Sequence, residues 1–75
     1  MPNVEIELHA RQRMAERHVT VDDIAYVWLH YEEDRPSKDH TGFRVRSGRV
    51  PDGRVVTIVG RLTPADFRVK TVWVA

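Results

Sequence analysis

Three basic side chains recur at every fourth position near the start of the sequence: His9, Arg13 and Arg17. They belong to residues 8–17, LHARQRMAER, a segment of good helix formers without glycine, proline or a β-branched residue. Residues four apart lie one above the other on a helix, so the three side chains form one stripe. The stripe runs beside the apolar seam of Ile6, Ala10 and Met14 and overlaps it at Arg17. Basic residues at the margin of a core are candidates for function.

A histidine with several arginines suits RNA cleavage without a metal ion. In that reaction the ribose 2′-hydroxyl attacks the adjacent phosphate, a base and an acid move protons, and cations stabilise the phosphorane. His9 could be the base or the acid because histidine titrates near neutral pH. Arg13 and Arg17 would support it. Further candidates for RNA binding lie in the second half of the chain: Arg44, Arg46, Arg61 and His40, the last also a second proton-transfer candidate.

The sequence lacks the patterns of other common sites. It contains no cysteine, and its four histidines do not show the spacing of metal ligands, so no metal is expected. It has no glycine-rich phosphate loop, dinucleotide fingerprint or Ser/His/Asp pattern, so no cofactor is expected. A helix-turn-helix is disfavoured because Asp22 and Asp23 open the second predicted helix and would repel phosphates.

Length and composition favour one small cytoplasmic domain over residues 1–75. The chain is 41% hydrophobic and 31% charged, which is usual for a globular domain. A secreted domain of this size is usually braced by disulfides, so the absence of cysteine favours a reducing compartment. The sequence shows no signal peptide and no apolar run that could span a bilayer, so we expect no membrane partner.

Charge is unevenly distributed, although the net charge is only +1. Residues 1–36 carry four basic and eight acidic side chains, whereas residues 37–75 carry eight basic and three acidic ones. Ten of the twelve basic residues are arginine, whose forked guanidinium suits phosphate. The basic half is either a solvated sheet face or a phosphate-binding surface, and the second interpretation suggests a nucleic-acid partner.

Two helices are expected in the first half of the chain. The first covers about residues 7–18, after a short extended arm of alternating polarity. The second covers about residues 20–33, where apolar residues recur with helical spacing. Thr20 is placed to cap it, with Asp23 three residues on. Pro36 cannot continue it.

Three strands are expected in the second half, at about residues 41–50, 54–62 and 67–74. Polar turns at residues 51–53 and 63–66 separate them. In the last strand, alternation predicts Val69, Thr71 and Trp73 on one face. The sequence therefore predicts an α+β domain in which two N-terminal helices pack on a C-terminal antiparallel meander of three to four strands.

Each candidate also has a purely structural interpretation. A histidine or arginine at a core margin can bind strand carbonyls or pair with a carboxylate, and this alternative is strongest for Arg17. Trp28 and Tyr31 are expected in the core. For Trp73, a core position is favoured over a platform for base stacking.

Residues 9–24, HARQRMAERHVTVDDI, resemble the opening of a family of small bacterial domains of unknown function, which begin with a His-Ala-x-x-Arg-Met-x-x-Arg helix. The segments GRVVTIVGRL and VKTVWVA resemble that family's strands. The family is grouped by fold with the RelE/barnase/EndoU-like (BECR) ribonucleases, many of which are toxins. The resemblance implies a RelE/barnase-like fold and metal-independent ribonuclease activity. Its matched positions are His9, Arg13, Arg17 and Thr71, and His18 stands where the family often has glycine.

Together these features predict a metal-independent endoribonuclease, toxin-like, that acts on RNA, either free or on the ribosome, and is held by a cognate antitoxin protein. The alternative is a non-catalytic module that binds RNA or protein, or forms a homodimer, through an exposed sheet edge. The two hypotheses differ in whether His9 faces a cleft shared with strand arginines.

Overall fold

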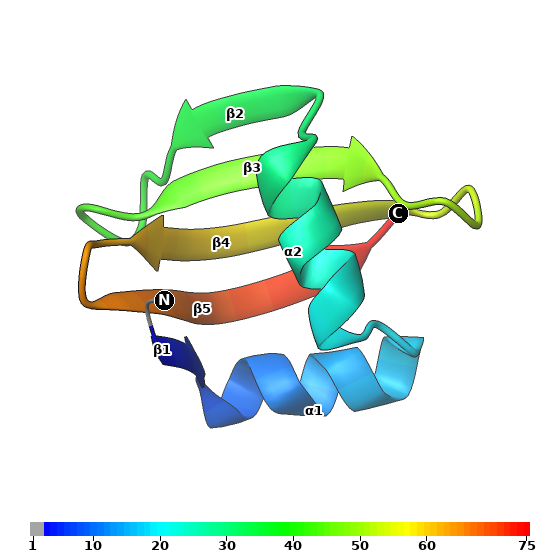
Figure 1. The fold of residues 1–75 in the computed structure, drawn as a ribbon, viewed down its shortest axis with the longest axis horizontal. Coiled ribbons are helices and arrows are strands. Elements are labelled where there is room, and N and C mark those ends of the chain that lie inside the picture. The colour runs from blue at the N-terminus through cyan, green and yellow to red at the C-terminus, as the bar shows by residue number, and fades with distance from the viewer. Residues whose placement is uncertain (1–2) are drawn as a thin grey trace.

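The computed structural model describes residues 3–75. It is an α+β structure of two helices and one five-stranded sheet (Figure 1). In chain order the elements are β1 (Asn3–Ile6), α1 (Leu8–Arg17), α2 (Val21–Leu29), β2 (Glu33–Pro36), β3 (Arg44–Arg49), β4 (Val55–Leu62) and β5 (Asp66–Val74). Neither helix in residues 3–75 has the length and apolar character needed to cross a membrane. The predicted class, with two N-terminal helices, is confirmed.

The sheet is mixed, with the strand order β1-β5-β4-β3-β2. Neighbours from β2 to β5 are antiparallel, whereas β1 pairs with β5 in parallel. The prediction of three to four antiparallel strands is therefore wrong. The expected extended arm became β1, because the edge of β5 offers its backbone hydrogen bonds and Arg68 there pairs with Glu5.

The second helix is shorter than predicted. It ends at Leu29, not near residue 33, and Glu33–Pro36 form β2. Backbone pairing with β3, together with ion pairs from Asp34 to Arg44 and Arg46, outweighs the local helical preference of this segment. The predicted limits of the other elements hold more closely: α1, β3 and β4 lie inside their predicted ranges, and β5 begins one residue earlier.

The turn between the helices is set by two caps. His18 ends α1 in the left-handed conformation, at φ 56° and ψ 41°, which glycine adopts at least cost. Thr20 then caps α2, as predicted. Its hydroxyl accepts from the Asp23 N–H at 3.1 Å, and its own N–H donates to the Asp23 carboxylate at 3.0 Å. This capping box fixes the start of α2.

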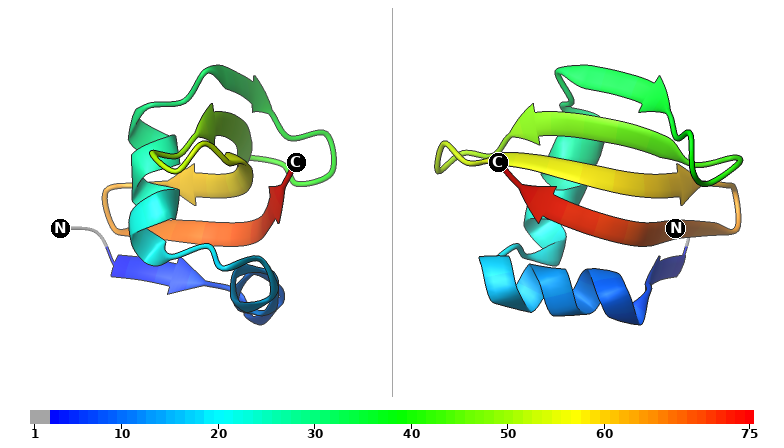
Figure 2. Two further views of the ribbon diagram at one scale, coloured as in Figure 1. Left: turned by 90° about the vertical axis from the view of Figure 1, so that its right-hand side faces the viewer. Right: turned by 180° about the vertical axis from the view of Figure 1, so that it is seen from behind.

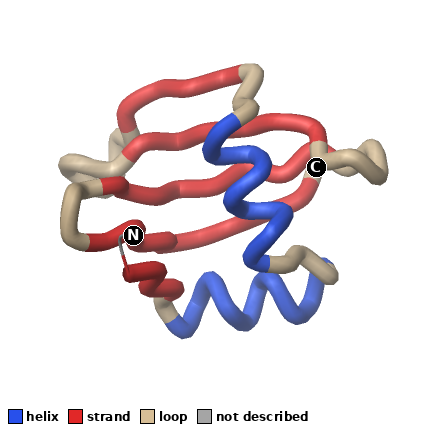
Figure 3. The backbone as a smooth tube through the Cα atoms, in the orientation of Figure 1, coloured by secondary structure: helices blue, strands red, loops and turns tan. Residues whose placement is uncertain are grey.

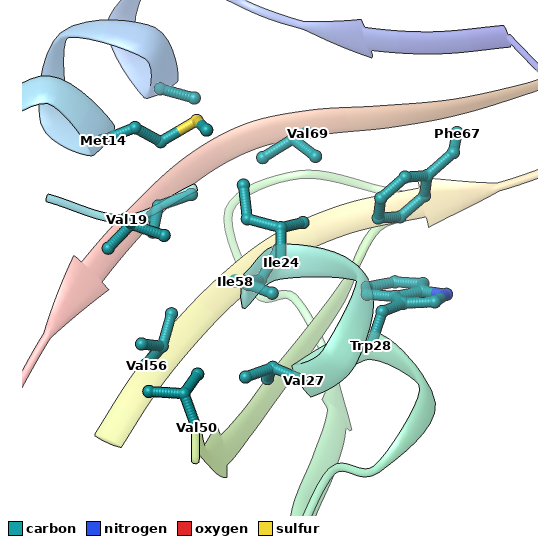
Figure 4. Close-up of a cluster of buried hydrophobic side chains, with 12 residues drawn as sticks. Met14, Val19, Ile24, Val27, Trp28, Val50, Val56, Ile58, Phe67 and Val69 are labelled. Carbon is teal, nitrogen blue, oxygen red and sulfur yellow. The ribbon is translucent and has the colours of Figure 1, made fainter. Parts of the chain in front are cut away.

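The main core lies between α2 and one face of the sheet. Helix α2 crosses that face, and α1 runs beside β5 (Figures 1 and 3). The close-up in Figure 4 shows Ile24, Val27 and Trp28 of α2 packed toward the strands, with Met14 reaching in from α1. The rings of Trp28 and Phe67 lie 4.8 Å apart. The core position predicted for Trp28 is thus confirmed.

Within residues 3–75 no helix crosses the opposite face of the sheet, which is seen from behind in the right-hand view of Figure 2. The same view shows α1 along the β5 edge. Two of the predicted core aromatics lie outside the core. Tyr31 and Trp73 are each 43% exposed, Trp73 on this uncovered face.

Candidate functional site

The uncovered sheet face is built from two rows of residues that lie opposite one another across the strands. Because residues that pair across strands share a face, each row marks one side of the sheet. The first row is Arg35, Val45, Val59 and Thr71, and the second row is Glu33, Ser47, Thr57 and Trp73. Val45 and Val59 form a small apolar cluster with Phe43, separate from the main core. We call this side of the sheet the open face.

A β-bulge determines which residues of β5 reach the open face. Val59 pairs with Thr71, but the next residue, Gly60, pairs with Val69, so Lys70 is an extra residue. The extra residue shifts the alternation. Val69 is consequently fully buried in the main core. The prediction that Val69 shares a face with Thr71 and Trp73 is wrong for this reason.

The open face contains a shallow hollow of about 210 Å³. Its wall is formed by β2, the loop that follows β2, and the middle strands. The lining residues are Arg35, Ser37, Lys38, Asp39, His40, Val45, Val59, Thr71 and Trp73. We call it the open-face hollow.

Local hydrogen bonds hold the loop that carries His40. The Ser37 N–H donates to the Phe43 carbonyl at 2.9 Å, and the Phe43 N–H donates to the His40 carbonyl at 3.0 Å. The His40 N–H donates to the Ser37 hydroxyl at 3.2 Å. Gly42, at φ 86°, allows the chain to reverse. The His40 ring meets the Phe43 ring edge-on, with centroids 6.2 Å apart, so the imidazole lies against the apolar cluster.

Several cations around this cluster have no carboxylate partner. Arg35, Lys38 and Arg61 form no ion pair within residues 3–75. The Arg61 guanidinium carbon lies 5.2 Å from the centre of the Phe43 ring, and its buried Nε finds no hydrogen-bond partner in the described chain. Lys70 lies 5.4 Å from the same ring but is 3.5 Å from the Glu7 carboxylate. The His40 end of the open face thus carries three cations without an ion-pair partner in the described residues, beside one unpaired carboxylate, Asp39.

Of the residues predicted from sequence, the structure brings His40 and Thr71 together in the hollow, with Arg61 over the adjoining Phe43 ring. An imidazole, a hydroxyl and free cations around one hollow could bind a phosphate and transfer a proton.

The helical stripe lies elsewhere. His9, Arg13 and Arg17 are exposed on α1, and none of them lines the hollow. Arg13 pairs with Glu16 at 3.3 Å. The side chains of His9 and Arg17 make no hydrogen bond to any residue from 3 to 75. The structure does not bring this stripe together with the strand arginines, so His9 does not meet the criterion by which the two hypotheses were to be distinguished. A nuclease centred on His9 is therefore not supported, and any catalytic site must lie elsewhere.

Arg44 and Arg46 lie on the helix-covered face, and their guanidinium groups are already engaged. Arg44 donates to both oxygens of Asp34, at 3.1 and 3.0 Å. Arg46 donates to Asp34 at 3.3 Å and to the Trp28 carbonyl at 2.9 Å. Its guanidinium carbon lies 4.2 Å from the Trp28 ring and 4.3 Å from the Tyr31 ring. The hydrogen bonds from Arg44 hold the pKa of Asp34 below its ordinary value, and Asp34 in turn raises the pKa of Arg44.

Sequence reasoning did not propose four polar residues of the hollow, Arg35, Ser37, Lys38 and Asp39, and it favoured a core position for Trp73, which lines the hollow instead. Arg35 lies just beyond the segment predicted as helix, so its pairing with Val45 was not visible. Lys38 and Asp39 flank His40 in a polar loop, and that proximity was the signal available. No group of three or more metal-ligating side chains occurs in the part of the chain that the structure describes.

Comparison with known proteins gives one match. No curated protein and no solved structure matches the chain. Residues 6–74 match the sequence model of a family described as "Domain of unknown function (DUF4258)". The match covers nearly the whole chain and confirms the expectation of a domain-of-unknown-function family. The chain therefore belongs to the DUF4258 family.

Proposed function

We propose that this domain is a toxin-like endoribonuclease with a RelE/barnase-like fold that cleaves RNA on its open face without a metal ion. One observation carries the proposal: His40, Asp39, Thr71 and unpaired cations surround one hollow on a sheet face that no helix covers. These groups match the needs of 2′-hydroxyl attack, which are proton transfer and stabilisation of a dianionic phosphorane.

Each side chain has a chemical task in this proposal. The Asp39 carboxylate accepts the 2′-hydroxyl proton, and the protonated imidazole of His40 donates a proton to the leaving 5′-oxygen. Lys38 and Arg35 hold the phosphate through charge-assisted hydrogen bonds. The Thr71 hydroxyl donates to a phosphate oxygen from the floor of the hollow.

The α1 stripe extends the RNA path in this proposal. Helix α1 runs beside β5, the strand that carries Thr71 (Figure 1). A strand of RNA that leaves the hollow over the β5 edge would meet His9, Arg13 and Arg17. These side chains would bind the flanking phosphates, whereas the family resemblance implies a catalytic task for them. Separate variants of His9 and His40 distinguish a catalytic task of the α1 stripe from a task in binding flanking phosphates.

Partners and location follow from the activity. A nuclease of this kind endangers the cell that makes it, so we propose that a cognate antitoxin protein covers the open face until release. The substrate is RNA in the cytoplasm, either free or bound to ribosomes.

The alternative is a module that binds RNA on the same face without cleaving it. A sheet-edge interface is less well supported. The edge strand β2 has four residues, of which Glu33, Asp34 and Arg35 are charged and the last is Pro36. Short, charged edges that contain proline resist pairing with another strand.

The test is cleavage of an end-labelled RNA of mixed sequence in EDTA by the wild type, H40A and H9A, with analysis of the product ends. We expect 2′,3′-cyclic phosphate ends, and a loss of about 100-fold or more in rate for H40A. H9A should retain a larger share of the rate and show weaker binding.

The matched control is H30A, since His30 is an exposed histidine at the end of α2 that contacts Tyr26 and lies outside the hollow. Circular dichroism of each variant checks that the fold persists. Absence of wild-type cleavage, both on free RNA and on translating ribosomes, would contradict the nuclease proposal. Retained RNA binding in that case would establish the binding module.

A further inference from the structure

Trp73 is the largest apolar side chain on the open face. Its side chain is 43% exposed, whereas Val72 and Val74, which flank it in β5, pack on the side of the main core. The bulge at Lys70 directs it away from that core. It lies opposite Thr57 and lines the open-face hollow together with Thr71. An indole in this position presents an aromatic surface beside the proposed phosphate site.

The polar groups next to Trp73 do not use its indole. Thr57 is buried, and its hydroxyl is 2.7 Å from that of Ser47, so the two hydroxyls satisfy each other. The indole N–H of Trp73 has no hydrogen-bond acceptor within residues 3–75. The ring thus offers both an exposed aromatic surface and a free donor.

The charged side chains around Trp73 favour binding of a polyanion at the His40 end of the open face only. Arg35 and Lys38, which share the hollow with Trp73, have no carboxylate partner in the described chain, and they outnumber the one carboxylate of this hollow, Asp39. At the other end of the open face, Glu32, Glu33 and Arg49 line a second, smaller hollow, so two carboxylates face one cation there. Neither carboxylate forms an ion pair within residues 3–75, and Arg49 donates to the Gly53 carbonyl at 2.8 Å. A nucleic acid would therefore be attracted to the His40 end and repelled beyond Trp73.

We propose that Trp73 is a stacking platform for one nucleobase of single-stranded RNA. This inference rests on the proposed binding of RNA in the open-face hollow and names its substrate form. A base of a duplex is already stacked on its neighbours and unavailable, whereas an unpaired base can lie flat on an aromatic ring. Stacking on Trp73 places the adjoining phosphate toward Lys38 and His40, and the carboxylates of Glu32 and Glu33 limit the site to this end of the face.

The first experiment uses the fluorescence of Trp73 in a W28F background, where Trp73 is the one remaining tryptophan. The probes are a 2′-O-methyl oligouridine, which cannot be cleaved by 2′-hydroxyl attack, a 2′-O-methyl duplex of equal length, and inorganic polyphosphate, which has charge but no base. We expect the oligouridine to quench the emission, and the duplex and polyphosphate to leave it unchanged.

The second experiment keeps Trp28 and measures affinity by anisotropy of the labelled oligouridine. W73A should bind about 5- to 150-fold more weakly, the range expected for the loss of one stacked base. Its affinity for polyphosphate should stay within about twofold of the wild type, because the cations remain. W73F, which keeps an aromatic ring, should recover most of the affinity. The matched control is Y26A, since Tyr26 is 40% exposed on α2 and lies away from the hollow.

The outcomes separate this inference from the proposed activity. Cleavage of RNA by W73A with unchanged affinity would overturn the stacking platform and leave the nuclease proposal intact. Quenching by oligouridine without cleavage by the wild type would support the platform and contradict the nuclease. Equal loss of oligouridine and polyphosphate affinity in W73A would assign Trp73 a structural role. A loss of oligouridine affinity in W73F as large as the loss in W73A would also count against stacking.

Discussion

Asp34 of β2 accepts two hydrogen bonds from the guanidinium of Arg44 on β3, at 3.1 and 3.0 Å. Arg46 adds a third at 3.3 Å and reaches on to the Trp28 carbonyl at the end of α2. One carboxylate thus joins two strands and a helix on the covered face of the sheet. Because β2 leads directly into the loop that carries His40, these ion pairs position the open-face hollow from the opposite side.

Replacement of Asp34 should loosen that connection. In D34N the side chain keeps its size but loses its charge, so both arginines lose their ionic partner. We expect the Tm to fall by about 5 °C, a modest change because the pairs are partly exposed to solvent. The measurement is thermal unfolding followed by circular dichroism. E32Q is the control, since Glu32 is exposed and forms no ion pair in the described chain, and its Tm should not change. An unchanged Tm in D34N would contradict this account.

The same carboxylate makes stability depend on pH at the acid end. The hydrogen bonds from Arg44 hold the pKa of Asp34 below its ordinary value of 3.8, and the backbone N–H of Arg54 lowers the pKa of Asp52. A carboxyl group with a lowered pKa in the folded state stabilises the fold above its ordinary pKa, and this contribution is lost as the pH falls through the folded value. Urea unfolding at about pH 5, 4 and 3 should therefore show falling stability, with a shallower decline in D34N than in the wild type. Equal declines would show that Asp34 does not carry the effect.

Gly60 marks the point where the strands β4 and β5 change register. A Cβ atom there would lie 3.1 Å from the Arg68 carbonyl oxygen and 3.1 Å from a ring carbon of Trp28. Both contacts are too close, and the carbonyl belongs to the backbone of a paired strand. We expect G60A to lose about 1–3 kcal/mol of unfolding free energy, as in other overpacked cores. Urea titration followed by tryptophan fluorescence measures this free energy, and wild-type stability in G60A would mean that the bulge can move.

The salt dependence of RNA affinity should show whether the unpaired cations of the open face contact phosphates. Each phosphate contact with single-stranded RNA contributes about 0.7 to the slope of log affinity against log salt. Lys38 and Arg61 have no carboxylate partner in the described chain, so we expect K38A and R61A each to lower that slope by about this amount. R11A, on α1, is the control: Arg11 donates to the Ile6 carbonyl, and we expect an unchanged slope. Unchanged slopes in K38A and R61A would place the RNA elsewhere.

Local signals in the sequence predicted much of the fold. The capping pair Thr20 and Asp23 and the helical spacing of α2 depend on neighbours within one turn, and the structure has them as predicted. Strand β2 was missed because it forms only through pairing with β3, about ten residues away. Strand β1 was not predicted as part of the sheet for the same reason, because it forms only by pairing with the edge of β5.

The site was predicted less well than the fold. The sequence named His40 and Thr71 as candidates, and both line the open-face hollow. It could not show that Lys70 is an extra residue in β5. Because of that bulge, Val69 and Trp73 lie on opposite faces of the sheet, although they are an even number of residues apart. Arg44 and Arg46 look from sequence like outward cations, and only the position of Asp34 shows that they are ion-paired.

The parallel pairing of β1 with β5 also bears on the order in which the chain folds. Glu5 and Arg68 form an ion pair across 63 positions of sequence, and Ile6 lies opposite Val69. Contacts between such distant segments require the closure of a long loop and form slowly. During synthesis the residues of β1 leave the ribosome before those of β5, and they remain without their partner strand until β5 has emerged. Since β5 also supplies Thr71 and Trp73, the chain completes its sheet and its open-face hollow in the same late step.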